Sequence, residues 1–167
     1  MTLIELMTVS VISAFLVMGL VGSVLLTNTA HYEYKTQIKL NNDARKAVDR
    51  MVWGRRDAGA ANRRGISEAV SAVVNPAQID YTDINAVVHS FRQNGGNIQY
   101  RNGAAGAWQT VFQHDPNAAF DATQQSTNLS FTQNNPNAVQ INLVLGQRVQ
   151  GRWHYASFST QVAFRNV

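Results

Sequence analysis

The chain has 167 residues, enough for one domain and too few for two of ordinary size. It contains no cysteine, which excludes disulfides, cysteine metal ligands and thiol catalysis. The formal net charge is +4, from 14 Lys and Arg against 10 Asp and Glu. A positive excess of this size is compatible with an acidic partner but does not by itself identify one.

The chain opens with an apolar stretch, TLIELMTVSVISAFLVMGLVGSVLL, over residues 2–26. After Glu5 no ionisable side chain follows until His31. About 20 apolar residues in a helix cross a bilayer, so residues 1–30 are predicted to form a hydrophobic helix half. A carboxylate at a membrane centre costs roughly 2.5 kcal/mol or more and usually has a functional partner. Glu5 therefore lies either at the aqueous end of an ordinary membrane anchor or beside a specific partner.

Residues 31–58 continue the helical pattern without a proline. Apolar residues recur there at steps of 3 and 4, the spacing of one helical face, at Leu40, Ala44, Ala47, Val48 and Met51. Asp57-Ala58-Gly59 predicts the end of this amphipathic half. The two halves together predict one helix of about 55 residues, about 80 Å long. We expect its second half to pack on the chain's own sheet.

Residues 59–167 are expected to form a β-rich globular head. Alternating or β-branched runs predict strands within residues 71–74, 78–81, 87–92, 97–101, 108–112, 128–131, 139–145 and 153–164. Asn94-Gly95-Gly96 predicts a hairpin turn between two of them. The predicted fold class is α+β: a long N-terminal α-helix packed on a C-terminal antiparallel β-sheet of about four strands.

The polar stretch 122–138 is interpreted as a hydrated loop around the weak strand signal at residues 128–131. Within it, Asn128-Leu129-Ser130 fits a glycosylation sequon with Asn128 as acceptor, although such triplets also arise by chance.

Basic residues gather around the predicted end of the helix. They form either a solvated helix face with local ion pairs, or an electrostatic contact with a neighbouring subunit, DNA or an acidic surface. The candidates for that contact are Arg45, Arg50, Arg55, Arg56, Arg63 and Arg64. Four aromatic residues could form a nucleic-acid stacking face, but the core between helix and sheet is the favoured interpretation of Trp53, Trp108, Trp153 and Phe158.

No catalytic or metal-binding pattern is found in the sequence. The four histidines are scattered and never stand at metal-ligand spacing. Asp80, Asp83, Asp115 and Asp121 are too dispersed to predict a calcium site. We therefore expect a protein that is not an enzyme, with no metal and no cofactor.

The segment Thr2-Leu3-Ile4-Glu5-Leu6-Met7, followed at once by the apolar run, resembles the mature N-terminus of type IV pilins and type II secretion pseudopilins. The resemblance implies that a prepilin peptidase removes a leader before Met1 and that the new amino group is methylated. Met1 stands where members of the family more often carry phenylalanine. Assembly is then implied to use Met1, Thr2 and Glu5, with the Glu5 carboxylate pairing to the positive amino terminus of a neighbouring subunit.

The resemblance implies a structural subunit of a type IV pilus-like extracellular filament. Its partners would be copies of itself and an inner-membrane assembly platform. The chain would lie in the inner membrane before assembly and at the cell surface afterwards.

Two alternatives to a main filament subunit remain open. The first is a minor pilin or pseudopilin that starts or caps a filament. It is suggested by residues 159–166, which resemble the last strand of such proteins, and by the absence of the C-terminal disulfide that many pilins have. The second is a module that binds nucleic acid through its arginines.

A weak point is predicted at Gly19, Gly22 and Ser23. Family members often carry proline at position 22, where this chain has Gly22. Two glycines within four residues cost the helix roughly 2 kcal/mol relative to alanine. Either the chain extends here on assembly, or the small residues let helices approach closely.

Overall fold

The structure, a computed structural model, describes residues 2–55, 63–113, 121 and 123–165. The chain divides into two compact units, Met1–Thr36 and Gln37–Val167.

One long helix, α1, runs from Leu3 to Trp53. It confirms the predicted helix, but the prediction that the helix reaches residue 58 is wrong. Gly54 follows with a φ of 73° and begins the short strand β1 (Gly54–Arg55), which pairs with β2 (Arg63–Arg64). A left-handed residue directly after a helix is usually glycine, because it has no Cβ to clash. The predicted stop at residues 57–59 lies outside the described residues.

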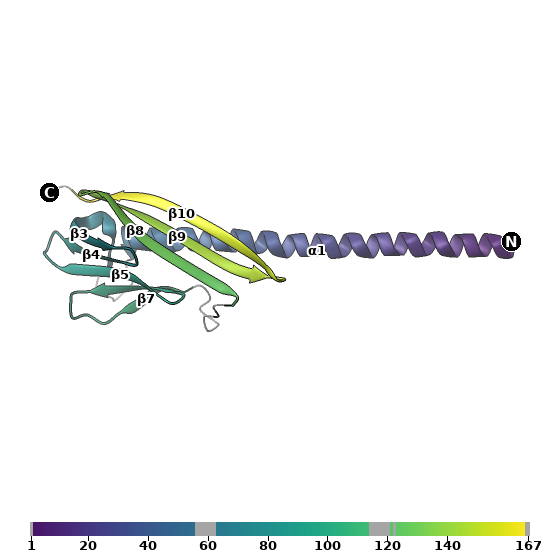
Figure 1. Cartoon of the computed structure of the whole chain (residues 1–167), viewed down its shortest axis with the longest axis horizontal. Coiled ribbons are helices and arrows are strands. Elements are labelled where there is room, and N and C mark those ends of the chain that lie inside the picture. The colour runs from purple at the N-terminus through teal and green to yellow at the C-terminus, as the bar shows by residue number, and fades with distance from the viewer. Residues whose placement is uncertain (1, 56–62, 114–120, 122, 166–167) are drawn as a thin grey trace. The chain divides into compact units, whose positions relative to one another are not determined.

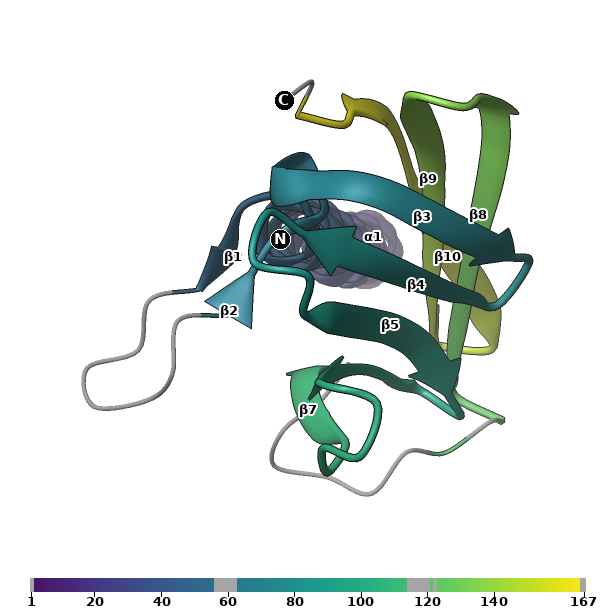
Figure 2. The same cartoon turned by 90° about the vertical axis from the view of Figure 1, so that its left-hand side faces the viewer.

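Two antiparallel sheets make up most of the rest (Figure 1 and Figure 2). A short 3-10 helix, η1 (Ile66–Glu68), precedes the first. That sheet has five strands in sequential order, β3 (Ala69–Asn75), β4 (Gln78–Asp83), β5 (Val88–Asn94), β6 (Asn97–Asn102) and β7 (Gln109–Gln113). The second has three strands in the order β10-β9-β8, with β8 (Gln125–Asn135), β9 (Ala138–Val149) and β10 (Arg152–Ala163).

The class α+β is confirmed, as is the hairpin, in which Gly95 and Gly96 join β5 to β6 with Asn94 opposite Asn97. The count of about four strands in one sheet is wrong, because the described residues form a sheet of five strands and a sheet of three, besides the pair β1-β2.

The interpretation of residues 122–138 as a hydrated loop is wrong, because strand β8 occupies most of this stretch. Every second side chain of its first part is buried, at Gln125, Thr127, Leu129 and Phe131. Alternation of this kind puts one face of a strand into the core. Gln93 of β5 holds β8 in place: its side-chain amide donates to the Thr127 carbonyl (2.6 Å) and its oxygen accepts from the Leu129 amide (2.7 Å).

The core of the unit Gln37–Val167 lies between the second half of α1 and both sheets. The predicted apolar face is confirmed: Leu40, Ala44, Ala47, Val48 and Met51 are each at most 2% exposed. Large side chains from the sheets, such as Tyr81, Phe91 and Tyr100, complete the core.

The interpretation of four aromatic residues as core is wrong for Trp53, Trp108 and Trp153, whereas Phe158 packs against the core. Trp53 is 70% exposed and Trp153 36%. Trp108 lies under the guanidinium groups of Arg92 and Arg101, 3.9 and 4.7 Å from its ring centre. Phe158 is partly buried at the margin of the core.

Two side chains of the helix reach carbonyl oxygens at strands on the margins of the two sheets. The Gln37 amide donates to the Tyr155 carbonyl of β10 (2.9 Å) and the Arg50 guanidinium to the Val111 carbonyl of β7 (2.6 Å). Within the described part of the chain, each of these strands pairs with one neighbour. The helix therefore satisfies part of the edge of both sheets.

A polar cluster centred on Asp83 lies within the same unit. The Asp83 carboxylate accepts from the Asn85 and Val87 amides (2.9 and 3.0 Å) and pairs with Arg64 (2.9 Å). His89 approaches it to 3.3 Å. Asp83 is 3% exposed, and burial raises the pKa of its carboxyl. Hydrogen bonds from Val87, His89 and Asn85, with the Arg64 charge, outweigh burial, so that pKa lies below its usual value.

Candidate functional site

The apolar segment Leu3–Leu26 is the strongest candidate for a functional surface. Every large apolar side chain in it is exposed, from 53% for Val21 to 80% for Leu3. Exposed apolar surface of this extent is rare on soluble monomers and marks contact with a membrane or a partner. By length and composition, α1 is the one helix among the described residues that could cross a membrane.

Hydroxyl groups in and just after the apolar segment bond to the helix itself. Thr8 and Ser10 donate to the carbonyls of Ile4 and Leu6 four residues earlier, at 3.0 and 2.8 Å. Thr27 and Thr29 do the same farther along, both at 2.9 Å. Such bonds let a hydroxyl enter an apolar medium without an external partner. These polar groups are therefore compatible with burial in lipid or protein.

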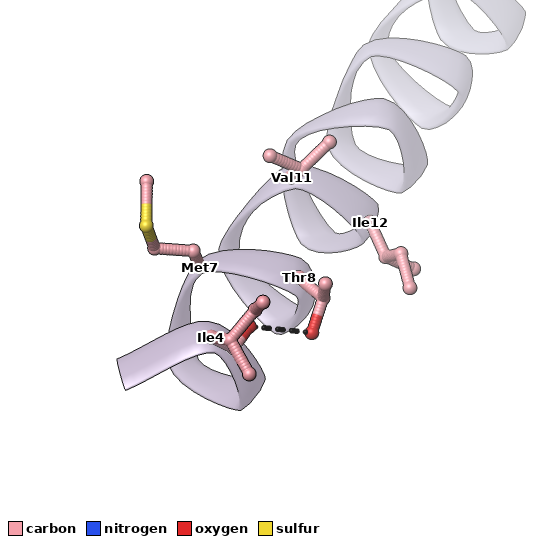
Figure 3. A pocket seen from close by; sticks show the side chains of 5 residues that line it. All are labelled: Ile4, Met7, Thr8, Val11 and Ile12. Carbon is pink, nitrogen blue, oxygen red and sulfur yellow. Dashed lines mark hydrogen bonds between the residues drawn. The ribbon is translucent and has the colours of Figure 1, made fainter. Parts of the chain in front are cut away.

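The first three turns of α1 carry a shallow apolar hollow of about 280 Å³ (Figure 3). It is lined by Ile4, Met7, Thr8, Val11 and Ile12. These residues are spaced by three and four, so they share one side of the helix. In Figure 3 the Thr8 hydroxyl turns back to the Ile4 carbonyl. The hollow therefore presents methyl and thioether groups.

Glu5 lies at the exposed beginning of the helix. Its carboxylate accepts a hydrogen bond from the Thr2 amide at 2.7 Å. The Thr2 carbonyl in turn accepts from the Glu5 amide at 3.1 Å. In the single chain the carboxylate thus satisfies one of the free amides of the first turn.

This capping contact was missed at the level of sequence, although a signal for it exists. Thr2-Leu3-Ile4-Glu5 fits the capping-box pattern, in which a glutamate three residues after a threonine bonds back to its amide. A cap and an intersubunit pairing make different demands on Glu5. The cap needs an oxygen acceptor, whereas the pairing needs a negative charge.

Gly19, Gly22 and Ser23 lie within the unbroken helix. A Cβ added at either glycine would meet no atom within 4 Å. The fold of the chain itself therefore gives no steric reason for glycine at these positions. Whether the segment extends or packs closely in an assembly stays a prediction.

The arginines predicted as an electrostatic contact do not form one free patch among the described side chains. Arg45 is exposed, but Arg50 bonds to the Val111 carbonyl, and Arg64 pairs with Glu68 and Asp83, both at 2.9 Å. Arg56 and the side chains of Arg55 and Arg63 lie outside the described part.

The remaining candidates lie apart from the apolar segment. Asn128 is exposed on β8, and its modification stays a prediction. Among the described residues no three histidine or acidic side chains gather as they would around a metal ion. Comparison with models of protein families, with curated proteins and with solved structures finds no match.

Proposed function

We propose that this chain is a structural subunit of a type IV pilus-like filament, held in a membrane by Leu3–Leu26 before assembly and polymerising through the same segment afterwards. The observation that carries the proposal is the exposure of this whole segment, with its one carboxylate at Glu5. A helix that is apolar on all sides needs cover on all sides, which a bilayer or a bundle of like helices provides.

The fold of the unit Gln37–Val167, called the head from here on, supports the proposal by contrast. The second half of α1 buries its apolar stripe in the chain's own core and keeps polar residues on the opposite side. The head therefore uses no part of Leu3–Leu26 for its own core, and that segment is available for another environment. The hollow at Ile4, Met7 and Val11 gives a neighbouring helix a place to pack.

Glu5 sets the register of assembly in this proposal. In an apolar bundle a carboxylate without a partner is strongly penalised, so a neighbour's amino terminus that reaches it fixes one axial position. The bond to Thr2 holds the carboxylate at the beginning of the helix until the pairing forms.

Paired substitutions at Glu5 test the proposal. Glu5→Gln keeps an oxygen for the Thr2 amide and removes the charge, whereas Glu5→Ala removes both. We expect both variants to lose filament assembly, measured as subunit recovered in sheared filaments and by electron microscopy. Only Glu5→Ala should lower helix content, by circular dichroism in detergent. Normal filament yield from Glu5→Gln would show that Glu5 is a cap and not an assembly contact.

A low-copy minor pilin or pseudopilin is the second candidate, favoured by the absence of cysteine and by the resemblance over residues 159–166. Quantitative mass spectrometry of purified filaments separates the two. A main subunit is expected to account for most of the filament mass, whereas about one copy per filament would identify an initiating or capping subunit.

A further inference from the structure

Strand β10 is an exposed sheet edge that lacks the usual protection. Among the residues that the structure describes it pairs with β9 alone, in an unbroken register from Arg152 to Ala163. From Trp153 to Ala163 it has no charged side chain other than the titratable His154, no proline and no bulge. Natural proteins use such features to keep free edges from pairing with other chains. An edge of this length without them indicates a strand that is covered in the functional state.

The open backbone groups of β10 can be assigned from its bonds. Alternate residues of an antiparallel strand direct their amide and carbonyl toward the partner strand or away from it. The Tyr155 carbonyl accepts a hydrogen bond from the Gln37 side chain, so the backbone groups of Tyr155 are directed away from β9. The same orientation recurs at steps of two, at Ser157, Ser159 and Gln161. Farther on, the Arg165 amide bonds to the Ala69 carbonyl. Among the described residues no hydrogen bond reaches the outward backbone groups of Ser157, Ser159 and Gln161.

The last turns of α1 form the second wall of a groove beside this edge. The groove has a volume of about 360 Å³ and includes Val48, Val52 and Trp53 on the helix side and Phe158, Thr160 and Val162 on the strand side. Trp53 is 70% exposed, and exposed tryptophans of this kind often anchor interfaces. The strand side of the lining also includes Gln161, one of the residues whose backbone groups are directed away from β9, whereas the helix side offers apolar surface. Extended polypeptide is the ligand that satisfies both.

We propose that this groove accepts an extended segment of a second copy of this chain, which adds a strand to the free edge of β10. Asp49 is the one charged residue of the groove lining, so it can pair with a lysine or arginine of the second copy, which carries 14 such residues. The inference rests on the proposed filament, in which copies lie side by side at high effective concentration. One added strand buries less surface than a stable dimer needs, so the contact forms only within the assembly.

Hydrogen exchange of the full chain tests the proposal, comparing detergent-dispersed subunits with assembled filaments. The amides of Ser157, Ser159 and Gln161 should exchange freely in the dispersed chain and at least about 100-fold more slowly in filaments. The amides of Phe158, Thr160 and Val162, which face β9, serve as internal references and should be protected in both states. Filaments in which the three outward amides still exchange freely would overturn the inference and leave the proposed function intact, whereas absence of filaments would contradict the proposed function itself.

Edge-blocking variants add a second measurement. Ser159→Pro removes an amide that β9 does not use, so it should fold like its control, Ser159→Ala. It should nevertheless lose at least tenfold of the filament protection at Ser157 and Gln161. Gln161→Lys should give the same loss of amide protection in filaments, and it keeps the backbone amide that proline removes. Asn128→Lys on β8 is its control. Two results would overturn the proposal, because each would show that something other than an added strand covers the edge. One is protection of the outward amides already in dispersed chains, and the other is unchanged protection in filaments of both blocking variants.

Discussion

The two halves of α1 are one continuous helix, yet they bury entirely different amounts of side chain. Between Gln37 and Trp53, six residues are buried, at Leu40, Ala44, Ala47, Val48, Met51 and Val52. Between Leu3 and Leu26 no residue is buried. The difference follows from pattern: an apolar stripe matches a sheet on one side, whereas apolar residues on every side match a surrounding medium. The head is therefore stabilised by the buried apolar stripe of α1 and not by helix formation alone.

The largest expected effect comes from a charge in the buried stripe. Val48 is 2% exposed, so Val48→Asp should destabilise the head by about 4 kcal/mol, because the carboxylate has no partner there. Thermal unfolding of the full chain in detergent measures the change. Asn42→Asp, on the exposed side of the same helix, should leave the melting temperature nearly unchanged. Equal stability of Val48→Asp and Asn42→Asp would mean that the stripe is not the core.

Matched truncations in the two halves give the next largest effect. Leu40→Ala should cost about 3 kcal/mol of head stability, since it leaves a cavity in a packed core. Leu16→Ala makes the same chemical change at a side chain that is 64% exposed and should not alter unfolding of the head. Denaturant unfolding followed by aromatic fluorescence distinguishes them, and a comparable loss from both would remove the distinction between the halves.

Acid should destabilise the head. The pKa of Asp83 lies below its usual value in the folded chain, so its ionised form adds stability above the unfolded-state pKa, near 4. This stability is lost as pH falls through the lower, folded-state pKa. Asp83→Asn should cost about 2 kcal/mol at pH 7, because it weakens charged hydrogen bonds, and less at pH 3. Urea unfolding at both pH values measures this, and an equal cost at both would exclude the carboxylate as the cause.

The smallest expected effect is at Gly22. Gly22→Ala should stabilise the helix in detergent by about 1 kcal/mol, with no clash in its own chain. If assembly extends the chain here, alanine and leucine should reduce filament yield similarly, because both favour the helix. If close approach is the reason for glycine, Gly22→Leu should be far worse than Gly22→Ala. An unbroken helix over residues 17–25 in assembled filaments would reject extension.

Local patterns in the sequence were sufficient to predict α1, its buried stripe and the β5–β6 hairpin. The division into two sheets was not predictable, because it depends on long-range contacts such as Gln93 with Thr127. Strand β8 was underestimated because its buried face includes Gln125 and Thr127, which composition alone assigns to solvent.

The tryptophans were misplaced for a related reason. Burial of Tyr81, Phe91 and Tyr100 fills the core and leaves Trp53 and Trp153 outside it. In the candidate site, the position of Glu5 was evident from the sequence. Its bond to Thr2 was not predicted, because it depends on the free amides of the first turn and not on the charge of Glu5.

The hydroxyls that bond within α1 have a consequence for how readily the helix could change surroundings. Thr8 and Ser10 keep the same acceptors whether lipid tails or other helices lie outside them. Transfer between the two media then exchanges mainly dispersion contacts, and Glu5 is the one carboxylate that must find a new counterpart. In the proposed filament, the pairing of Glu5 would therefore contribute more to the free-energy difference between bilayer and polymer than the hydroxyls of this segment.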